Sequence, residues 1–469
     1  MQYIGVIGMD VMGKNLALNI ENKGYSVAIF NRSYDKTEKV LAENQDKNLI
    51  GTKTIGEFVA SLEKPRKIIL MIKAGKPVDE TLDLLLSYIE IGDIVIDGGN
   101  SFFKDTIRRT ELLAKAGVTF VGMGVSGGEE GALKGPAIMP GGTAEAYEKI
   151  GKLLCDISAK LDGEPCCIHI GTDGSGHYVK MVHNGIEYAD MQLICESYNL
   201  IANVTGLSAP EISKIFGEWN NGELNSYLVE ITRDILNVYD NQTGNPLVDV
   251  ILDKAQQKGT GKWTSISALD LGVDVSTITQ SVFARCMSSD KDNRINASNI
   301  YNKKINKILD KKDYPQFIES VRKALYASKI CAYTQGFALL KAAAAEYNWD
   351  LDFGSIAMIF RGGCIIRAQF LHRIKEAYDT NKNLQNLLIN SYFKQIMQDY
   401  ELDFRFVASI AAQSGIPSPA FMSALSYYDQ YTSENLPANL LQAQRDYFGA
   451  HTFERTDKPG NFHHKWIDE

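Results

Sequence analysis

The chain has 469 residues, which predicts two to four domains, and 45% of them are hydrophobic, which suffices for a large core and excludes a disordered chain. Its formal net charge of −8 argues against a protein dedicated to binding nucleic acid or an anionic membrane. An acidic protein can still bind an anionic substrate, but its lysine and arginine residues must then be concentrated locally.

The first third of the chain alternates short apolar runs with amphipathic stretches. This alternation predicts a doubly wound, mostly parallel α/β sheet with helices between the strands. We expect strands at residues 3–7, 26–30, 67–72, 93–97, 118–121 and 168–170, and helices at residues 13–23, 76–88 and 105–115.

After Ser175 the strand-like runs all but vanish, and long amphipathic helical patterns follow, for example at residues 178–203, 315–347 and 355–380. In the tail, proline, glycine, arginine and histidine mix with aromatic residues, and the aromatics favour docking on another surface. We therefore predict an α/β domain at residues 1–176, a large all-helical domain at residues 177–434 and a C-terminal tail at residues 435–469.

The seven cysteines form no C-x-x-C pair and the seven histidines form no H-x-x-x-H motif, so we expect reduced thiols in a cytoplasmic protein and no metal site. No run of 18 apolar residues occurs, and the first residues already belong to a strand. We therefore expect no membrane span and no signal peptide.

The first predicted strand runs into a glycine turn and then a helix, the arrangement by which a Rossmann-type domain holds a pyrophosphate at a helix N-terminus. The turn consists of Gly8, Met9, Asp10, Val11, Met12 and Gly13. Because it lacks the middle glycine of the usual G-x-G-x-x-G motif, a tight turn without a ligand stays open as an alternative.

The second strand is followed by Asn31, Arg32 and Ser33, where an NAD site would have a carboxylate for the ribose hydroxyl. Arg32 can face a 2′-phosphate, which favours NADP over NAD, although it could also be a solvated surface cation. Asp10 conflicts with such a site, because a carboxylate about 5 Å from a phosphate costs on the order of 3 kcal/mol at an effective dielectric constant of about 20. We expect Asp10→Ala to tighten NADP binding.

Two further strands lead into polar glycine-rich segments, one with Asn100 and one with Ser126, Gly127 and Gly128. Both are predicted to lie at the carboxyl edge of the sheet, where ligands bind, but glycine clusters are also common in plain turns.

The strongest local pattern lies on the first long helix of the helical part. At 100° per residue, its polar residues fall within an arc of about 140°: Lys180, His183, Asn184, Glu187 and Tyr188. Gly185 on the opposite side costs ~1 kcal/mol in mid-helix and indicates close approach by another backbone. A packed helix with such a polar face points into a cleft, whereas the alternative is an ordinary solvated face.

A compact basic glycine loop with Lys258 and Thr260 is suited to a phosphate. Arg285, Arg445 and His451 are isolated polar residues that, taken singly, are more often surface groups than ligands.

Taken together, these segments closely resemble the decarboxylating 6-phosphogluconate dehydrogenases over essentially the whole chain. The most specific stretches are residues 95–101, 124–131, 177–188 and 251–263, the last of which reads ILDKAQQKGTGKW. The resemblance implies oxidation of 6-phosphogluconate at C3 by NADP, loss of CO₂ and release of ribulose 5-phosphate, a step of the pentose phosphate pathway and of gluconate use. It also implies Lys180 as the base and Glu187 as the acid, with no metal.

By the same resemblance, one group of residues contacts the substrate: Asn100, Ser126, Gly127, Gly128, His183, Asn184, Tyr188, Lys258, Thr260, Arg285, Arg445 and His451. Ile72, Lys73, Ala74 and Asn100 join the glycine turn and residues 31–33 as cofactor neighbours. The family forms homodimers in which the tail reaches the partner's site. Asp10 departs from the family, where a small residue is usual.

The sequence is also compatible with two rival hypotheses. A non-decarboxylating β-hydroxyacid dehydrogenase should have a much shorter helical domain and lack the loop of Lys258. A catalytically silent NADP-binding relative would keep the fold alone, and the presence of both Lys180 and Glu187 argues against it.

Overall fold

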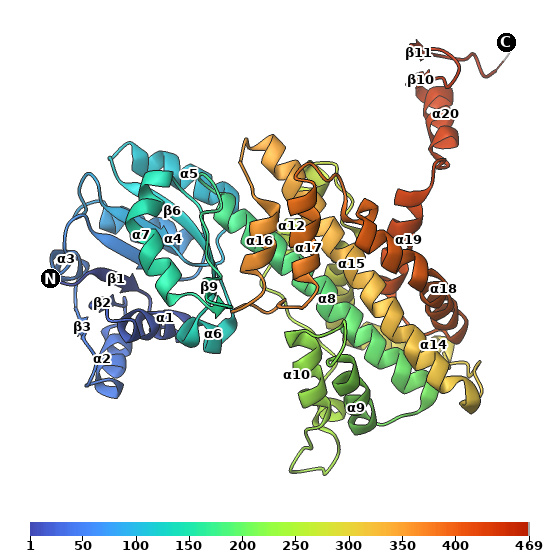
Figure 1. Cartoon of the computed structure of the whole chain (residues 1–469), viewed down its shortest axis with the longest axis horizontal. Helices are drawn as coiled ribbons and strands as arrows, with labels where there is room; N and C mark the ends of the chain where they lie inside the picture. Colours follow the sequence, from blue (N-terminus) through green and yellow to red (C-terminus); the bar gives the residue numbers. More distant parts are fainter. Residues whose placement is uncertain (468–469) are drawn as a thin grey trace. The chain divides into compact units, whose positions relative to one another are not determined.

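The computed structural model describes residues 1–467, which form two units, Met1–Ala424 and a smaller unit that begins at Leu425. The first unit contains a part built on a sheet, blue to teal in Figure 1, and a group of long helices, green to orange.

The sheet consists of the strands β1 (Ile4–Ile7), β2 (Val27–Phe30), β3 (Leu49–Gly51), β4 (Lys67–Leu70), β5 (Ile94–Asp97), β6 (Thr119–Ser126) and β7 (Ala137–Pro140). Their order is β3-β2-β1-β4-β5-β6-β7, and all neighbours are parallel except β6 and β7. The central strands β1, β4 and β5 are buried throughout, as the continuous apolar runs of a sheet covered on both faces require. This confirms the predicted fold class.

The helices of this part are α1 (Val11–Asn22), α2 (Tyr34–Glu43), α3 (Ile55–Ala60), α4 (Lys76–Leu85), α5 (Phe103–Ala114), α6 (Gly128–Lys134) and α7 (Ala144–Ile157). Helices α1 and α7 bury Leu16 and Leu153 in one core, and α3, α4 and α5 bury Phe58, Leu82 and Leu113 in another. The strand order turns back between β1 and β4, the point at which doubly wound sheets bind ligands beyond the carboxyl ends of their strands.

Two long helices form the centre of the helical part: α8 (Ser175–Thr205) and α15 (Tyr314–Glu346) pack against each other, and α18 (Ser391–Ser414) packs on α15. The Nζ atom of Lys329 lies 2.6 and 2.7 Å from the two carboxylate oxygens of Asp190, and both side chains are buried. This ion pair links α15 to α8. The predicted domain boundary at residue 176 falls in the first turn of α8, and the domain division itself stays a prediction.

The other helices of the chain surround these or lead away from them. They are α9 (Ala209–Trp219), α10 (Tyr227–Leu236), α11 (Leu247–Val250), α12 (Thr260–Asp270), α13 (Ser276–Ser289), α14 (Lys291–Tyr301), α16 (Phe353–Ile359), α17 (Leu371–Thr380) and α19 (Pro419–Thr432), with short 3₁₀ turns at Lys311–Asp313 and Leu387–Ile389. Helices α12 and α13 pack on α8, and this places them beside the polar face predicted from the sequence.

Two predicted elements are wrong. The helix expected at residues 355–380 is broken into α16 and α17 by a loop with Gly362 and Gly363; Gly363 has a φ of +62°, and a Cβ there would lie 2.5 Å from the carbonyl oxygen of Gly135. The strand expected at residues 168–170 is absent from the described chain. Only Cys167 forms an isolated bridge, with Ile138, after a hairpin of β8 (Lys160–Leu161) and β9 (Glu164–Pro165).

The second unit is a small folded tail. It contains α20 (Ala438–Gly449) and a hairpin of β10 (Phe453–Glu454) and β11 (Asn461–Phe462). Asp446 is its buried polar centre: its carboxylate accepts hydrogen bonds from the backbone of Thr452 and His464 and from the indole of Trp466, and it lies 2.8 Å from Nδ1 of His463.

Across residues 1–467, no helix is long and apolar enough to cross a membrane. The same residues contain no group of three or more His, Cys, Asp or Glu side chains that could hold a metal ion. All seven cysteines are free thiols.

Candidate active site

The turn after β1 is shaped for close approach of a ligand to backbone. Gly8 has a φ of +102°, and a Cβ at Gly13 would lie 1.8 Å from the carbonyl oxygen of Gly8, so neither position tolerates a side chain. Asp10 occupies the N-cap position of α1 but makes no side-chain capping hydrogen bond. Instead its carboxylate forms an ion pair with Lys36, so the first N–H groups of α1 stay available to a ligand.

A cavity of about 380 Å³ lies beside this turn. It is lined by residues from the ends of β1, β2 and β4 and from α2, among them Gly8, Asp10, Asn31, Arg32, Ser33, Lys36, Ile72 and Lys73. The Asn31 side chain accepts a hydrogen bond from the Met9 backbone at 3.0 Å and donates one to the Ser33 carbonyl at 3.0 Å. Asn31 therefore connects the glycine turn to the loop of Arg32, whose side chain is exposed.

A second cavity, of about 430 Å³, contains the polar face of α8. Of the predicted site residues it collects Met12, Asn100, Ser126, Gly127, Gly128, Lys180, Asn184, Glu187, Tyr188, Lys258, Thr260 and Arg285. The sequence did not single out Val125, Gln256, Gln257 and Ile365, which also line it. Val125 lies inside the specific stretch 124–131 and the two glutamines lie inside the stretch 251–263. Ile365 lies in the loop between α16 and α17, where the sequence predicts a helix, and no sequence pattern indicates a role for it.

Glycines bring the walls of this cavity together. A Cβ at Gly124 of β6 would lie 2.5 Å from the Cβ of Lys180, so a glycine there lets the Lys180 stem rest on the strand. Gly127 has a φ of +112°, and a Cβ there would lie 2.5 Å from the carbonyl oxygen of Gly363. Strand β6, helix α8 and the loop between α16 and α17 thus meet at the predicted catalytic lysine.

The side chains on α8 form a connected polar group. Nδ1 of His183 lies 3.1 Å from Oδ1 of Asn184 and 3.5 Å from Nζ of Lys180, and its Nε2 lies 3.5 Å from Oγ of Ser126. Glu187 Oε2 is 3.8 Å from Nδ1 of His183. His183 is fully buried and does not line the cavity. It therefore contacts Ser126, Lys180 and Asn184 from the protein interior and not from the cavity.

Burial shifts the protonation equilibria of this group. It lowers the pKa of Lys180, against the opposing charge of Glu187, and it raises the pKa of Glu187, against the charge of Lys180. Burial, and then the neighbouring Lys180, hold the pKa of His183 well below its ordinary value, so the imidazole is neutral. Both shifts favour the uncharged forms, a neutral amine and a protonated carboxyl, which are the forms needed to take up one proton and deliver another.

The far end of the cavity is cationic. The Arg285 guanidinium lies 3.5 Å from the centre of the Tyr188 ring and donates a hydrogen bond to the Gln256 carbonyl at 3.3 Å. Thr260 is the first residue of α12, after Gly259 with a φ of +96°. A helix N-terminus flanked by Lys258 and Arg285 is suited to a phosphate.

Val11 and Ala74 line neither cavity. Two predicted substrate residues, Arg445 and His451, lie in the tail unit. Both are exposed: Arg445 donates a hydrogen bond to the Gln442 side chain at 3.1 Å, and His451 lies edge-on to Phe448 with ring centres 5.8 Å apart. Their position relative to the cavity stays a prediction.

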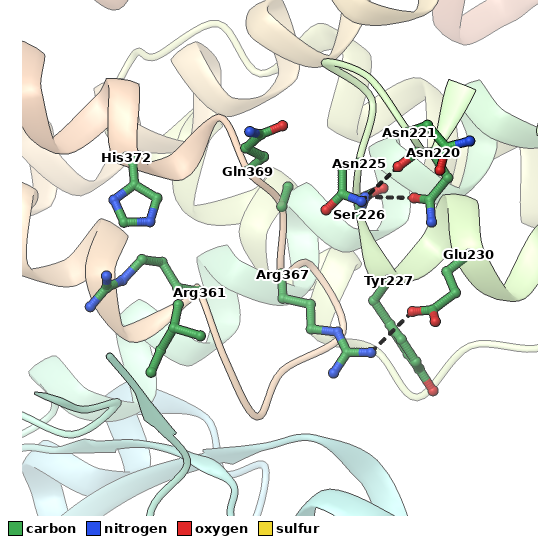
Figure 2. A pocket seen from close by; sticks show the side chains of 12 residues that line it. Asn220, Asn221, Asn225, Ser226, Tyr227, Glu230, Arg361, Arg367, Gln369 and His372 are labelled. Atoms are coloured by element: carbon green, nitrogen blue, oxygen red, sulfur yellow. Dashed lines mark hydrogen bonds and ion pairs between the residues drawn. The ribbon is translucent and has the colours of Figure 1, made fainter. Parts of the chain in front are cut away.

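A larger cavity, of about 680 Å³, lies between α10 and the loop before α17 (Figure 2). Its cationic Arg367 is paired with Glu230 at 3.3 Å and lies 4.4 Å from the ring centre of Tyr227. Asparagine side chains and Arg361 form much of the rest of the cavity lining. None of the predicted site residues lines it, so we place the chemistry beside α8.

Comparison with known proteins identifies relatives over the full length. Profiles described as the NAD binding domain and the C-terminal domain of 6-phosphogluconate dehydrogenase match residues 3–171 and 176–466. The NADP(+)-dependent, decarboxylating 6-phosphogluconate dehydrogenase of Bacillus subtilis is 61% identical over 467 residues, 99% of each chain, and the decarboxylating enzyme of Escherichia coli K12 is 58% identical over 100% of this chain and 99% of its own.

A solved structure is also similar. That of Plasmodium falciparum 6-phosphogluconate dehydrogenase, described with its cofactor NADP⁺ and its substrate 6-phosphogluconate, superimposes with a TM-score of 0.95 at 46% identity and covers 99% of this chain and 100% of its own.

Proposed function

The chain belongs to the decarboxylating 6-phosphogluconate dehydrogenase family, and on that premise we propose that the cavity beside α8 is its active site. The protein oxidises 6-phosphogluconate with NADP, releasing CO₂ and ribulose 5-phosphate. The observation that carries the site assignment is the gathering of Asn100, from the loop after β5, with Lys180 and Glu187, both from α8, around one cavity with a cationic far end.

The cofactor residues we propose are the turn 8–13, residues 31–33 and 72–74, and Asn100. The absence of side chains at Gly8 and Gly13 and the free N–H groups of α1 fit a diphosphate. Arg32, with Lys36 nearby, provides the positive charge that a 2′-phosphate requires. Bound NADP would accept the hydride that leaves C3 of the substrate.

Lys180 is the proposed base. Removing the proton of the C3 hydroxyl requires a neutral amine, and burial favours that form of Lys180. The resulting ammonium can then polarise the new C3 carbonyl, which draws in the electron pair left when the C1 carboxylate departs as CO₂. This accounts for decarboxylation by the chain's own residues.

Glu187 is the proposed acid. Loss of CO₂ leaves an enediol that needs a proton on the carbon that lost the carboxylate, which becomes C1 of the product. A carboxyl group whose protonated form is favoured by burial can deliver it. Ser126, Gly127, Gly128, His183 and Asn184 position the sugar acid in this proposal, and Tyr188, Lys258, Thr260 and Arg285 hold its phosphate.

We further propose a homodimer in which the tail of each subunit brings Arg445 and His451 to the phosphate end of the partner's cavity. The support is that both side chains are exposed on the tail unit, together with apolar groups such as Leu440 and Phe448, which are 63% and 73% exposed. A large exposed apolar surface marks a docking surface, here for a second copy of the chain. The seven free thiols support the expected cytoplasmic location.

Glu187→Gln tests the site. Glutamine keeps the shape but cannot deliver the proton, so we expect kcat to fall by about 10²- to 10⁴-fold while both KM values change little. NADPH formation and trapped CO₂ should be measured together. Near-normal turnover would reject the role of Glu187.

Glu196→Gln is a matched control. Glu196 lies on the same helix and is also buried, with its pKa raised to about 7, but it accepts hydrogen bonds from the backbone of Ala420 and Phe421 and does not line the cavity. Its kcat should stay near the wild-type value. A loss as large as that of Glu187→Gln would mean that the effect is not specific to the site.

The pH dependence follows from the two shifted groups. Activity should be lost as pH falls through the pKa of Lys180, because the base becomes protonated, and this limb should lie below the ordinary lysine value of 10.5. Activity should also be lost as pH rises through the pKa of Glu187, which lies above 4.5. Glu187→Gln should remove the alkaline limb of kcat, and a retained alkaline limb would assign it to another group.

A further inference from the structure

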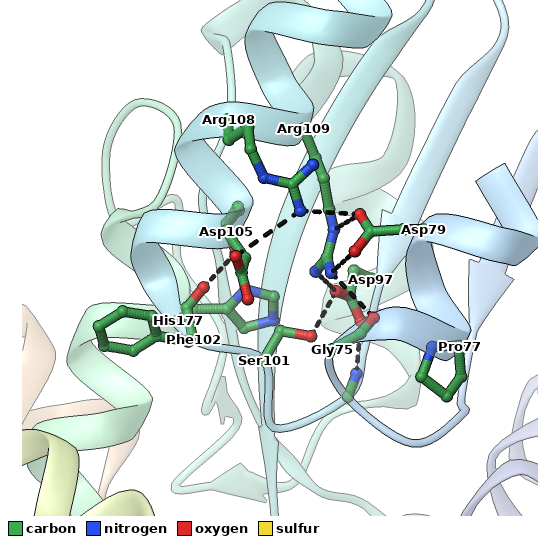
Figure 3. A network of polar contacts seen from close by, with 12 residues as sticks. Gly75, Pro77, Asp79, Asp97, Ser101, Phe102, Asp105, Arg108, Arg109 and His177 are labelled. Carbon is green, nitrogen blue, oxygen red and sulfur yellow. Dashed lines mark hydrogen bonds and ion pairs between the residues drawn. The ribbon is translucent and has the colours of Figure 1, made fainter. Parts of the chain in front are cut away.

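Arg109 is a fully buried arginine in the sheet part, outside the cavities described above. Its Nε donates to Oδ1 of Asp79 at 2.8 Å, and one terminal nitrogen donates to Oδ2 of Asp79 at 3.1 Å and to the carbonyl oxygen of Gly75 at 3.0 Å. The other terminal nitrogen lies 3.6 Å from Oδ2 of Asp97. Figure 3 shows the guanidinium between the two carboxylates.

Asp97, the last residue of β5, holds the segment that follows it. Its Oδ1 accepts the backbone N–H of Gly99 at 3.0 Å, and its Oδ2 accepts the hydroxyl of Ser101 at 2.6 Å. Asn100 lies between these two anchored residues and is itself exposed to the cavity. The carboxylate therefore fixes the loop on both sides of Asn100.

Gly75 closes the loop after β4 and is the N-cap of α4, with a φ of +87°. Lys73 and Ala74 come directly before it. By binding the Gly75 carbonyl and the Asp97 carboxylate with one planar group, Arg109 ties the loop of Lys73 and Ala74 to the loop of Asn100. Only a guanidinium has donors in enough directions to do this.

A second contact connects the same region to the catalytic helix. His177 of α8 is fully buried, and its Nδ1 lies 2.7 Å from the hydroxyl of Thr106 on α5, one turn from Arg109. His177 lies three residues before Lys180. The helix that carries Arg109 is thus also attached to the helix that carries the proposed base.

Burying a guanidinium costs several kcal/mol unless it is paired and hydrogen-bonded, and apolar residues often stabilise a core equally well. Stability alone therefore does not account for an arginine at this position. We propose that Arg109 is a positioning residue that sets the separation of two loops: residues 73–75, beside the cavity proposed for the 2′-phosphate, and residues 98–101, beside the cavity of Lys180. NADP would have to span both. This inference rests on the cofactor residues given under the proposed function.

The test compares two ligands on Arg109→Lys. Lysine keeps the charge but cannot reach Asp79, Gly75 and Asp97 together. The Kd of NADP, measured by titration calorimetry, should rise about tenfold, because one favourable contact with the cofactor is lost. The Kd of 2′,5′-ADP should stay within about twofold, because this ligand lacks the nicotinamide half, does not span both loops and does not depend on their separation. A role in fold stability alone would leave both affinities unchanged or weaken both equally, and either result would overturn the proposal.

Arg108→Gln is the matched control. Arg108 is the neighbouring residue and also binds Asp79, at 2.8 Å, but its side chain is 52% exposed and makes no contact with Gly75 or Asp97. Neither ligand should bind more weakly to it. If Arg109→Lys fails to fold, Asp97→Asn replaces it under the same criteria, because it removes the charge that faces Arg109 and keeps the side-chain shape.

Asn100→Ala separates failure of this inference from failure of the proposed site. If it weakens NADP binding while Arg109→Lys does not, Asn100 binds the cofactor but Arg109 does not position it. If Asn100→Ala leaves both NADP affinity and kcat unchanged, the assignment of that loop to the site is itself wrong.

Discussion

At the scale of single residues, the negative charge of Asp10 conflicts with the anionic diphosphate proposed to bind beside it. It lies at the N-terminus of α1, where the proposed diphosphate would meet a carboxylate, yet that carboxylate neither caps the helix nor stays unpaired. Its ion pair with Lys36 cancels much of the repulsion calculated for an isolated charge. The same ion pair, however, engages Lys36, a cation that lines the cavity proposed for the 2′-phosphate.

Asp10→Ala should therefore still tighten NADP binding, but only several-fold, because exposed ion pairs are weak and screened by salt. Part of the gain should come from Lys36, which becomes free to approach a phosphate. Titration calorimetry on Asp10→Ala, Lys36→Ala and the double variant separates the two contributions. Unchanged or weaker binding by Asp10→Ala at low salt would contradict the argument.

At the scale of elements, the packing of α12 on α8 determines where the phosphate end of the cavity lies. A Cβ at Gly185 would lie 2.7 Å from Cγ2 and 2.9 Å from Oγ1 of Thr264, whose hydroxyl donates to the Met181 carbonyl at 2.9 Å. The close approach expected at Gly185 thus comes from a buried side chain and not from a backbone. Thr260 begins α12 one turn before Thr264.

Gly185→Ala should push α12 away from α8. We expect a net loss of stability of about 1–3 kcal/mol from overpacking, despite the ~1 kcal/mol that alanine contributes as a better helix former, and a raised KM for 6-phosphogluconate. Gly217→Ala in α9 is the control, because its Cβ would first meet the flexible Arg233 side chain at 3.4 Å. Urea unfolding and KM measure both effects. Equal stability and KM in wild type and Gly185→Ala would refute the packing argument.

The sequence predicted those elements whose patterns are local. The apolar runs of β1, β4 and β5 and the periodicity of α8 and α15 were sufficient to predict these elements. A strand buried on both faces and a helix buried along one stripe each have a characteristic order of apolar residues in the sequence. The strands β3 and β7 were missed, since one has three residues and the other ends in proline. The break between α16 and α17 was missed because helical periodicity continues across it.

The sequence predicted the part of the site that lies on one helix and in a few glycine loops. The arc from Lys180 to Tyr188 is a property of the helix alone, and the structure places most of it around one cavity. Arg109 could not be identified in this way. In sequence it resembles any surface cation of an amphipathic helix, and its burial depends on Asp79, Asp97 and Gly75, which only the fold brings together.

At the scale of the whole molecule, the tail must present Arg445 and His451 in a fixed geometry if it completes a partner's site. Asp446 can provide this, because it follows Arg445 directly and binds the backbone N–H of Thr452, the residue after His451, at 3.0 Å. It also binds the His464 backbone and the Trp466 indole, and so joins α20 to residues 464–466. Ala450 and Thr452, with φ of +50° and +60°, make the turn between them.

Asp446→Asn should loosen that turn. Its amide can accept only part of the four contacts that converge on the carboxylate, so we expect the KM for 6-phosphogluconate to rise roughly tenfold while the KM for NADP stays unchanged. An equal rise in both KM values would indicate general unfolding of the tail instead of misplaced substrate contacts.

Mixed dimers then show whether the tail completes the site of its own subunit or that of the partner subunit. Subunits with Lys180→Met have an intact tail and no base, and subunits with Asp446→Asn have an intact base and a damaged tail. If tails are exchanged, a purified mixed dimer contains one complete site, so at low substrate it should show about half the activity of wild type, far above either parent. If each tail serves its own subunit, no complete site forms, and the mixed dimer should show only half of the low activity of Asp446→Asn. That second result would exclude tail exchange while leaving the role of Asp446 in ordering the tail intact.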